Sequence, residues 1–152
     1  MAGIESERTS GWGKRNKLLH KAPVWYVHLM REFDTTIVDR LNSETRNEPV
    51  HFVALGTAHF ELGFDKLQIK TMSGAAFFIA SRHFVWELEP TDAPIGLRLA
   101  QIPTNFELHT PLVLRMLLSS SDYVDFYTDE LSSEAAIINF GYFDGVHHLE
   151  IF

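Results

Sequence analysis

The run of short apolar segments between Pro49 and Pro90 constrains the fold more than any other feature of this sequence. Large apolar residues recur at every second position in 60–64 and again in 84–89, where Phe84, Trp86 and Leu88 alternate with Val85, Glu87 and Glu89. This is the period of a β-strand. Only a few residues separate one segment from the next, whereas a parallel return needs a dozen or more. The pattern therefore predicts an antiparallel meander. Residues 75–80 are apolar on both faces, so we expect a central strand, or one covered by a helix or a second subunit.

A helical pattern precedes this region. Apolar residues recur at helical spacing after Pro23, at Tyr26, Met30, Phe33, Ile37 and Leu41. Proline suits the first position of a helix, and the polar run after Leu41 suits its end. These signals predict one long N-terminal helix.

The second half of the chain gives weaker signals. Four prolines in 90–111 restrict any strand there to a short or edge position, with 95–102 as the best candidate. Residues 111–118 suit a short helix. Residues 119–134 fit a strand or a helix, and we favour a helix because Ser119 and Asp122 resemble a helix start. Asp144-Gly145 between two apolar runs predicts a C-terminal β-hairpin.

The expected fold class is thus α+β: an antiparallel sheet of about five to seven strands, the long N-terminal helix, one or two short helices and the hairpin. A length of 152 residues suits one domain, here 22–152. The absence of cysteine excludes disulfides, zinc–thiolate sites and cysteine nucleophiles, and favours a reducing compartment. No apolar run approaches the roughly 20 residues of a membrane-spanning helix. We expect an intracellular, cytoplasmic protein without a transmembrane segment.

Charge is distributed unevenly along the chain. Residues 1–21 hold five Lys or Arg residues against two Glu residues, a net charge of +3, which leaves −10 for residues 22–152. We expect residues 1–21 to be a flexible basic arm, with Trp12 between two glycines suited to docking. An acidic body repels nucleic acid, so only weak nucleic-acid or phosphate contact through the arm is expected. The alternative is that the arm is a solubilising tail.

Motifs for catalysis are missing. Eight histidines are present, but their spacing matches no metal site, and His147 and His148 point to opposite faces of any strand. No nucleophile elbow, phosphate-binding loop or dinucleotide fingerprint occurs. We expect no metal, no other cofactor and no catalytic residue, which favours a non-enzymatic protein.

The acidic and aromatic run 121–130 is the second unusual feature. On a helix, Asp122, Asp125 and Asp129 would share one face. The run lacks the central glycine of a calcium-binding loop. Two interpretations remain open for it, a solvated acidic face and a patch that binds a partner.

Two functions from different classes are compatible with these features. The first is a protein-interaction or self-assembly domain, of structural, matrix-like, inhibitor or adaptor type, as in some small viral or phage proteins by analogy of charge and size alone. Its partner-binding residues would be Trp12, Lys14, Arg15, Lys17, Asp122, Asp125 and Asp129. The alternative is a ligand-binding or catalytic domain with a pocket between the first helix and the sheet. The candidate pocket residues are Tyr26, His51, His59 and Asp65.

Overall fold

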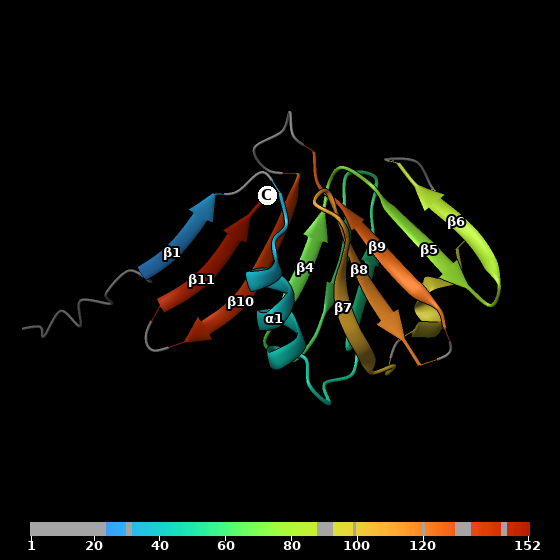
Figure 1. Cartoon of the computed structure of the whole chain (residues 1–152), viewed down its shortest axis with the longest axis horizontal. Coiled ribbons are helices and arrows are strands. Elements are labelled where there is room, and N and C mark those ends of the chain that lie inside the picture. Colours follow the sequence, from blue (N-terminus) through green and yellow to red (C-terminus); the bar gives the residue numbers. More distant parts are fainter. Residues whose placement is uncertain are drawn as a thin grey trace, which may run out of the picture.

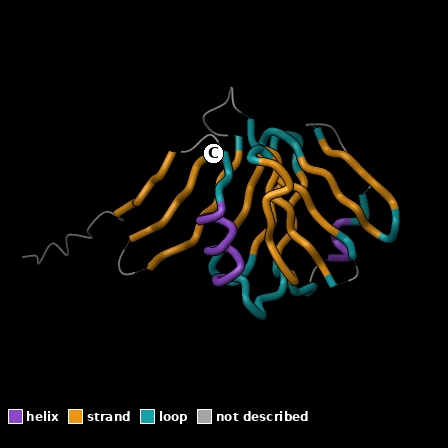
Figure 2. The backbone as a smooth tube through the Cα atoms, viewed as in Figure 1, coloured by secondary structure: helices purple, strands orange, loops and turns teal. Residues whose placement is uncertain are grey.

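The computed structural model describes residues 24–29, 32–87, 93–98, 100–119, 121–129, 135–143 and 146–152. In this part the chain forms two β-sheets and one α-helix (Figures 1 and 2). It is a mixed fold in which strand predominates, so the α+β class is confirmed in outline. The strands, however, form two sheets and not one.

Six strands make the first sheet, in the spatial order β1, β11, β10, β4, β3 and β2. Their bounds in that order are Val24–Leu29, Val146–Ile151, Ala136–Phe143, Gln68–Thr71, Phe60–Gly63 and Phe52–Leu55. Five strands make the second, in the order β6, β5, β9, β8 and β7. Their bounds are Arg82–Trp86, Ala75–Ile79, Tyr123–Tyr127, Val113–Leu118 and Pro103–Thr110. Neighbouring strands are antiparallel, except that β1 runs parallel to β11.

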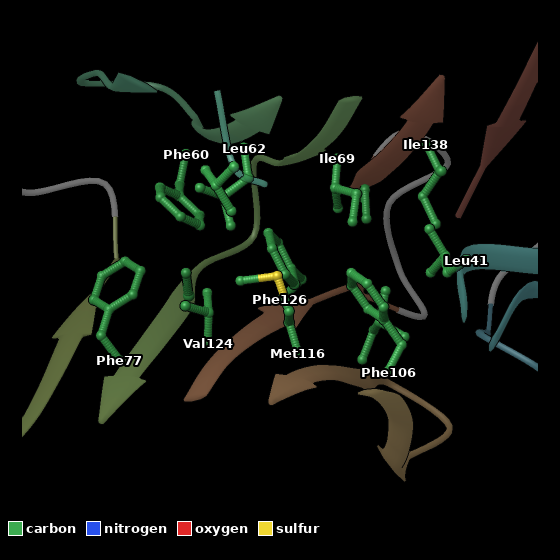
Figure 3. Packing of buried hydrophobic residues seen from close by; sticks show 14 of the residues in the cluster. Leu41, Phe60, Leu62, Ile69, Phe77, Phe106, Met116, Val124, Phe126 and Ile138 are labelled. Carbon is green, nitrogen blue, oxygen red and sulfur yellow. The ribbon is translucent and has the colours of Figure 1, made fainter. Parts of the chain in front are cut away.

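The core lies between the two sheets, where one side of each is apolar. Phe60 of β3 packs against Phe77 of β5 and Phe126 of β9, with ring centroids 4.9 and 5.6 Å apart. Figure 3 shows these rings meeting across the gap between the sheets. Every second residue of a strand faces the same side, so the alternation seen in the sequence is what builds this interior.

The helix α1 (Thr35–Glu44) extends the layer formed by the five-stranded sheet. Asp34 caps its first turn by accepting a hydrogen bond from the Ile37 N–H at 2.9 Å. Ile37 and Leu41 are buried, and Figure 3 shows Leu41 next to Ile138 of β10. In Figure 1 the helix lies beside β7, in front of the six-stranded sheet. It thereby covers a part of that sheet that the five strands leave open. No helix in the described ranges has the length and apolar character needed to cross a membrane.

The predicted long N-terminal helix is wrong. Its first part, Val24–Leu29, is strand β1, and α1 begins only at Thr35. The segment is rich in β-branched and aromatic residues, and its hydrogen bonds are made to β11. A partner more than a hundred positions away along the chain therefore decides the conformation of a segment whose spacing also fits a helix.

The predicted short helices are also wrong where the structure describes them. Residues 113–118 are β8 and residues 123–127 are β9, a hairpin pair within the five-stranded sheet. The best strand candidate at 95–102 contains instead a short 3-10 helix, Ile95–Arg98, whereas Pro103–Thr110 is a strand. Proline is tolerated at Pro103 because it begins an edge strand.

The region between Pro49 and Pro90 forms five strands, as the alternation predicts, but they divide between the sheets. The chain crosses over after β4, where the Thr71 hydroxyl donates to the carbonyl of Tyr127 at 2.6 Å and also lies 3.1 Å from the carbonyl of Gly74. Gly74 has a φ of 138°, and a Cβ there would lie 3.1 Å from the Tyr127 ring, so no other residue suits this crossing. The C-terminal hairpin is confirmed by the antiparallel pairing of β10 and β11.

Candidate interaction surface

The side of the five-stranded sheet that faces away from the core carries an unusual set of side chains. In the middle three strands, this side presents Phe78 of β5, Tyr123, Asp125 and Tyr127 of β9, and Arg115 of β8. Glu107 of β7 and Glu87, just after β6, lie toward its two margins. We call these seven residues the aromatic-acidic face.

The centre of this face is an ordered cluster. Phe78 and Tyr123 stack with ring centroids 5.3 Å apart and planes 10° from parallel. The guanidinium carbon of Arg115 lies 3.9 Å from the centroid of the Tyr123 ring, in reach of a cation–π interaction. The aromatic rings and the cation therefore form one contiguous patch.

Asp125 holds Arg115 in this position. Arg115 donates two hydrogen bonds to the Asp125 carboxylate, at 2.7 and 2.9 Å. This is the two-pronged geometry that makes an arginine–carboxylate pair rigid and directional. The hydrogen bonds to Asp125 also raise the pKa of Arg115. Arg115 is thus a fixed, permanently charged part of the face.

Tyr127 completes the face next to Glu87. Its pKa is raised by burial first, and further by the nearby negative charges of Asp125 and Glu87. Because Asp125 is neutralised by Arg115, the remaining carboxylates are Glu87 and Glu107 at the margins. The face therefore combines aromatic rings, an arginine–carboxylate pair and two marginal carboxylates, and Tyr, Phe and Arg are residue types enriched in protein–protein interfaces.

The three aspartates of the predicted acidic patch do not share a helical face, because residues 123–127 are a strand. Asp122 is 4% exposed, pairs with Arg98 at 3.0 Å and accepts a hydrogen bond from the Ala80 N–H. Asp125 is equally buried and pairs with Arg115. Asp129 follows β9 and is partly buried. The interpretation as a solvated acidic face is therefore wrong for Asp122 and Asp125.

The candidate pocket residues are not brought together. Tyr26 lies in β1, at one edge of the six-stranded sheet, whereas His51 and His59 flank β2 at the opposite edge. His51 and His59 occupy opposite ends of the β2–β3 hairpin, and His59 lies 3.8 Å from Glu61. Asp65 is exposed in the β3–β4 turn. Its side chain borders a hollow of about 140 Å³.

That hollow is lined by Glu44, Glu48, Phe64, Asp65, Lys66 and Leu67. A second one, of about 330 Å³, is lined by Asn42, Thr45, Arg46, Asn47, Ile102, Pro103, Thr104 and Asn105. Across the described ranges, no three His, Asp or Glu side chains are grouped as metal ligands would be. The arm residues Trp12, Lys14, Arg15 and Lys17 lie outside the described residues.

Sequence reasoning missed Phe78, Arg115, Tyr123, Tyr127 and the two marginal glutamates as parts of one surface. Within β9, Tyr123 and Tyr127 alternate with the buried residues Val124 and Phe126. Alternation of this kind identifies a common side of each strand once the strands are assigned. Comparisons with protein-family models, with curated proteins and with solved structures found no match.

Proposed function

We propose that this protein is a non-enzymatic self-assembly domain in which the basic arm of one copy binds the aromatic-acidic face of another. The observation that carries the proposal is the ordered Phe78–Tyr123–Arg115 cluster on the outward side of the five-stranded sheet. Such a cluster costs side-chain entropy to hold in place and offers a preorganised binding surface.

Charge complementarity selects the arm as the occupant. Residues 1–21 carry a net +3, while Glu87 and Glu107 flank the aromatic centre. Trp12 is the arm residue suited to pack on Tyr123 and Phe78, because aromatic anchors dominate many interfaces. Lys14, Arg15 and Lys17 follow it closely enough to reach the glutamates at the margins.

The test exchanges charges between the two surfaces in the full chain. Lys14→Glu with Arg15→Glu is expected to lower the solution mass measured by light scattering, and so is Glu87→Lys with Glu107→Lys. An equimolar mixture of the two variants should recover the mass, because the reversed charges are again complementary.

The matched control for the arm variant is Arg46→Glu with Lys66→Glu, which makes the same change of net charge as that variant at two exposed positions away from the face. It should leave the mass unchanged. A monomeric mass for the unaltered chain, or the same mass for the arm variant and the unaltered chain, would exclude assembly through the arm.

A further inference from the structure

β2 is a four-residue edge strand that carries no charge, proline or register shift. Natural edge strands carry charges, prolines or bulges. β2 consists of Phe52, Val53, Ala54 and Leu55, and its register with β3 runs without a shift. Phe52 is 46% exposed, a high value for a phenylalanine. Among the described residues, Val50 just before β2 already bonds to Ala100 and Gln101 through its carbonyl and N–H, at 2.8 Å each. The open part of this edge is therefore Phe52–Leu55.

The edges of the five-stranded sheet are managed differently. β7 begins with Pro103 and contains two irregularities of register. The Asn42 side chain of α1 also accepts a hydrogen bond from the Phe106 N–H at 2.6 Å and donates one to the Phe106 carbonyl at 3.0 Å. β6 exposes Arg82 and His83. Compared with these two edges, β2 has no charged residue, and no described side chain bonds to its outward backbone groups.

The backbone of β2 shows which groups are available. Gly56 donates its N–H to the carbonyl of His59 across the β2–β3 turn, at 2.9 Å. Because the backbone groups of an antiparallel strand alternate between its two sides, Phe52 and Ala54 direct theirs to β3. Val53 and Leu55 direct their N–H and carbonyl groups to the open edge.

We propose that β2 pairs with β2 of a second copy, antiparallel, about a twofold axis at Ala54. In this register Val53 of each copy lies opposite Leu55 of the other and exchanges both of its backbone hydrogen bonds with it. The two Ala54 residues face each other, and the two six-stranded sheets become one continuous sheet. The interface is the same patch on both copies, as a twofold dimer requires.

Charge and shape favour a second copy as the occupant. Residues 22–152 carry −10, so most surfaces of two copies repel each other, but residues 49–60 contain no Asp, Glu, Lys or Arg. In the proposed register, Phe52 lies opposite Gly56 of the second copy, which leaves room for its ring. On its own sheet Phe52 already covers Gly63, whose Cβ position is 3.2 Å from the Phe52 Cβ.

The decisive experiment uses Ala54→Cys in the full chain, which contains no other cysteine. Directly opposed residues at a non-hydrogen-bonded position have Cα atoms about 4.5 Å apart, within the range of about 4.4–6.8 Å that a disulfide spans. Mild oxidation should convert most of this variant to a covalent dimer on a non-reducing gel. Ala58→Cys, exposed in the β2–β3 turn, is the control and should stay monomeric. Equal cross-linking of the two variants would overturn the proposed register.

A second pair of variants tests the same contact without oxidation. Ala54→Glu and Ala54→Lys each place like charges opposite one another and should lower the solution mass, while their mixture should recover it. Ala54 is partly exposed and lies opposite Glu61 on its own sheet, so circular dichroism of each separate variant is the control for an intact fold. A mixture that stays at the mass of the separate variants contradicts pairing at Ala54.

The inference rests on the proposed function only in that the chain self-associates, and it uses another surface. Adding Lys14→Glu and Arg15→Glu to Ala54→Cys should leave the cross-linked dimer intact. If the arm substitutions leave the solution mass unchanged while Ala54→Cys still cross-links, only the arm proposal is contradicted. If the arm substitutions lower the solution mass but Ala54→Cys cross-links no better than Ala58→Cys, only the β2 pairing is contradicted.

Discussion

Tyr127 lies half-buried on the aromatic-acidic face, close to Asp125 and Glu87, and its pKa is raised mainly by burial. The folded protein therefore favours the neutral phenol. The unfolded chain releases this proton near the ordinary value of about 10. The stability that the neutral phenol contributes is present below that value and is lost as the pH rises through the raised pKa of the folded state.

We therefore expect Tyr127→Phe to make the protein less sensitive to alkali. The urea midpoint of the unaltered chain should fall between about pH 8 and about pH 11, and the fall should be smaller in the variant because phenylalanine cannot ionise. The comparison at about pH 8, where the phenol is neutral in both states, is the control for any packing effect of the lost hydroxyl. Equal losses in the two proteins would show that Tyr127 contributes nothing to the alkaline response.

The Arg115–Asp125 pair shows why the site was not predictable residue by residue. The two residues are ten positions apart and meet because β8 and β9 form a hairpin. The sequence spacing of Tyr123, Tyr127 and Leu131 also fits a helix, on which Arg115 and Asp125 would not pair. Once the strands are known, the alternation of Tyr123, Asp125 and Tyr127 follows directly.

At the scale of elements, α1 protects the edge of the five-stranded sheet. The Asn42 amide offers both a donor and an acceptor, and it pairs with the Phe106 backbone as a neighbouring strand would. One side chain thus ends the sheet at β7 and fixes the helix beside it.

Asn42→Ala should destabilise the protein by about 1–3 kcal/mol, because it leaves a backbone donor and an acceptor of Phe106 without partners. Asn42→Asp keeps an acceptor for the Phe106 N–H but places a carboxylate oxygen against the Phe106 carbonyl, so it should also destabilise the protein. Ser43→Ala, at the next and exposed position of α1, is the matched control in urea unfolding. If Asn42→Ala lowers the free energy of unfolding no more than Ser43→Ala does, the Asn42 amide does not stabilise the edge strand β7.

Strand positions were predictable where alternation and turn residues agreed. The predictions failed where a strand partner distant in the sequence determines the local conformation. The β10–β11 hairpin follows from Asp144-Gly145 between apolar runs. The β5–β6 turn gave no such signal, because Ala80 and Ser81 occupy its two positions of positive φ, at 51° and 64°, which usually require Gly, Asn or Asp. Asp122 stabilises this turn through the Ala80 N–H, a contact that sequence spacing does not indicate.

On the scale of the whole molecule, the two sheets depend on one shared interior. Phe60 is fully buried and touches rings of the opposite sheet on β5 and β9. The sequence predicted strands around Phe60 and in 75–80, whereas Phe126 lies in a segment for which a helix was favoured. The division into two sheets depends on the crossing at Gly74. That division is decided by packing across the whole molecule and leaves no periodic signal.

Phe60→Ala should therefore lower the stability of both sheets together, by about 3–5 kcal/mol. Unfolding followed by circular dichroism and by tryptophan fluorescence should shift by the same amount and stay coincident, as expected for one cooperative unit. Phe52→Ala, on the same sheet but largely exposed, should cost under about 1 kcal/mol at protein concentrations where the chain is monomeric. Two separated transitions in Phe60→Ala would indicate that the sheets unfold independently.

The parallel pairing of β1 with β11 has a consequence for biosynthesis. Val24 pairs with Val146, and Leu29 with Ile151, so the ribosome must deliver almost the whole described chain before β1 has a neighbour. Domains begin to fold during synthesis from their N-terminal side, but here the first strand has to wait for one of the last. The six-stranded sheet therefore gains its β1 edge only after residues 146–151 have been synthesised.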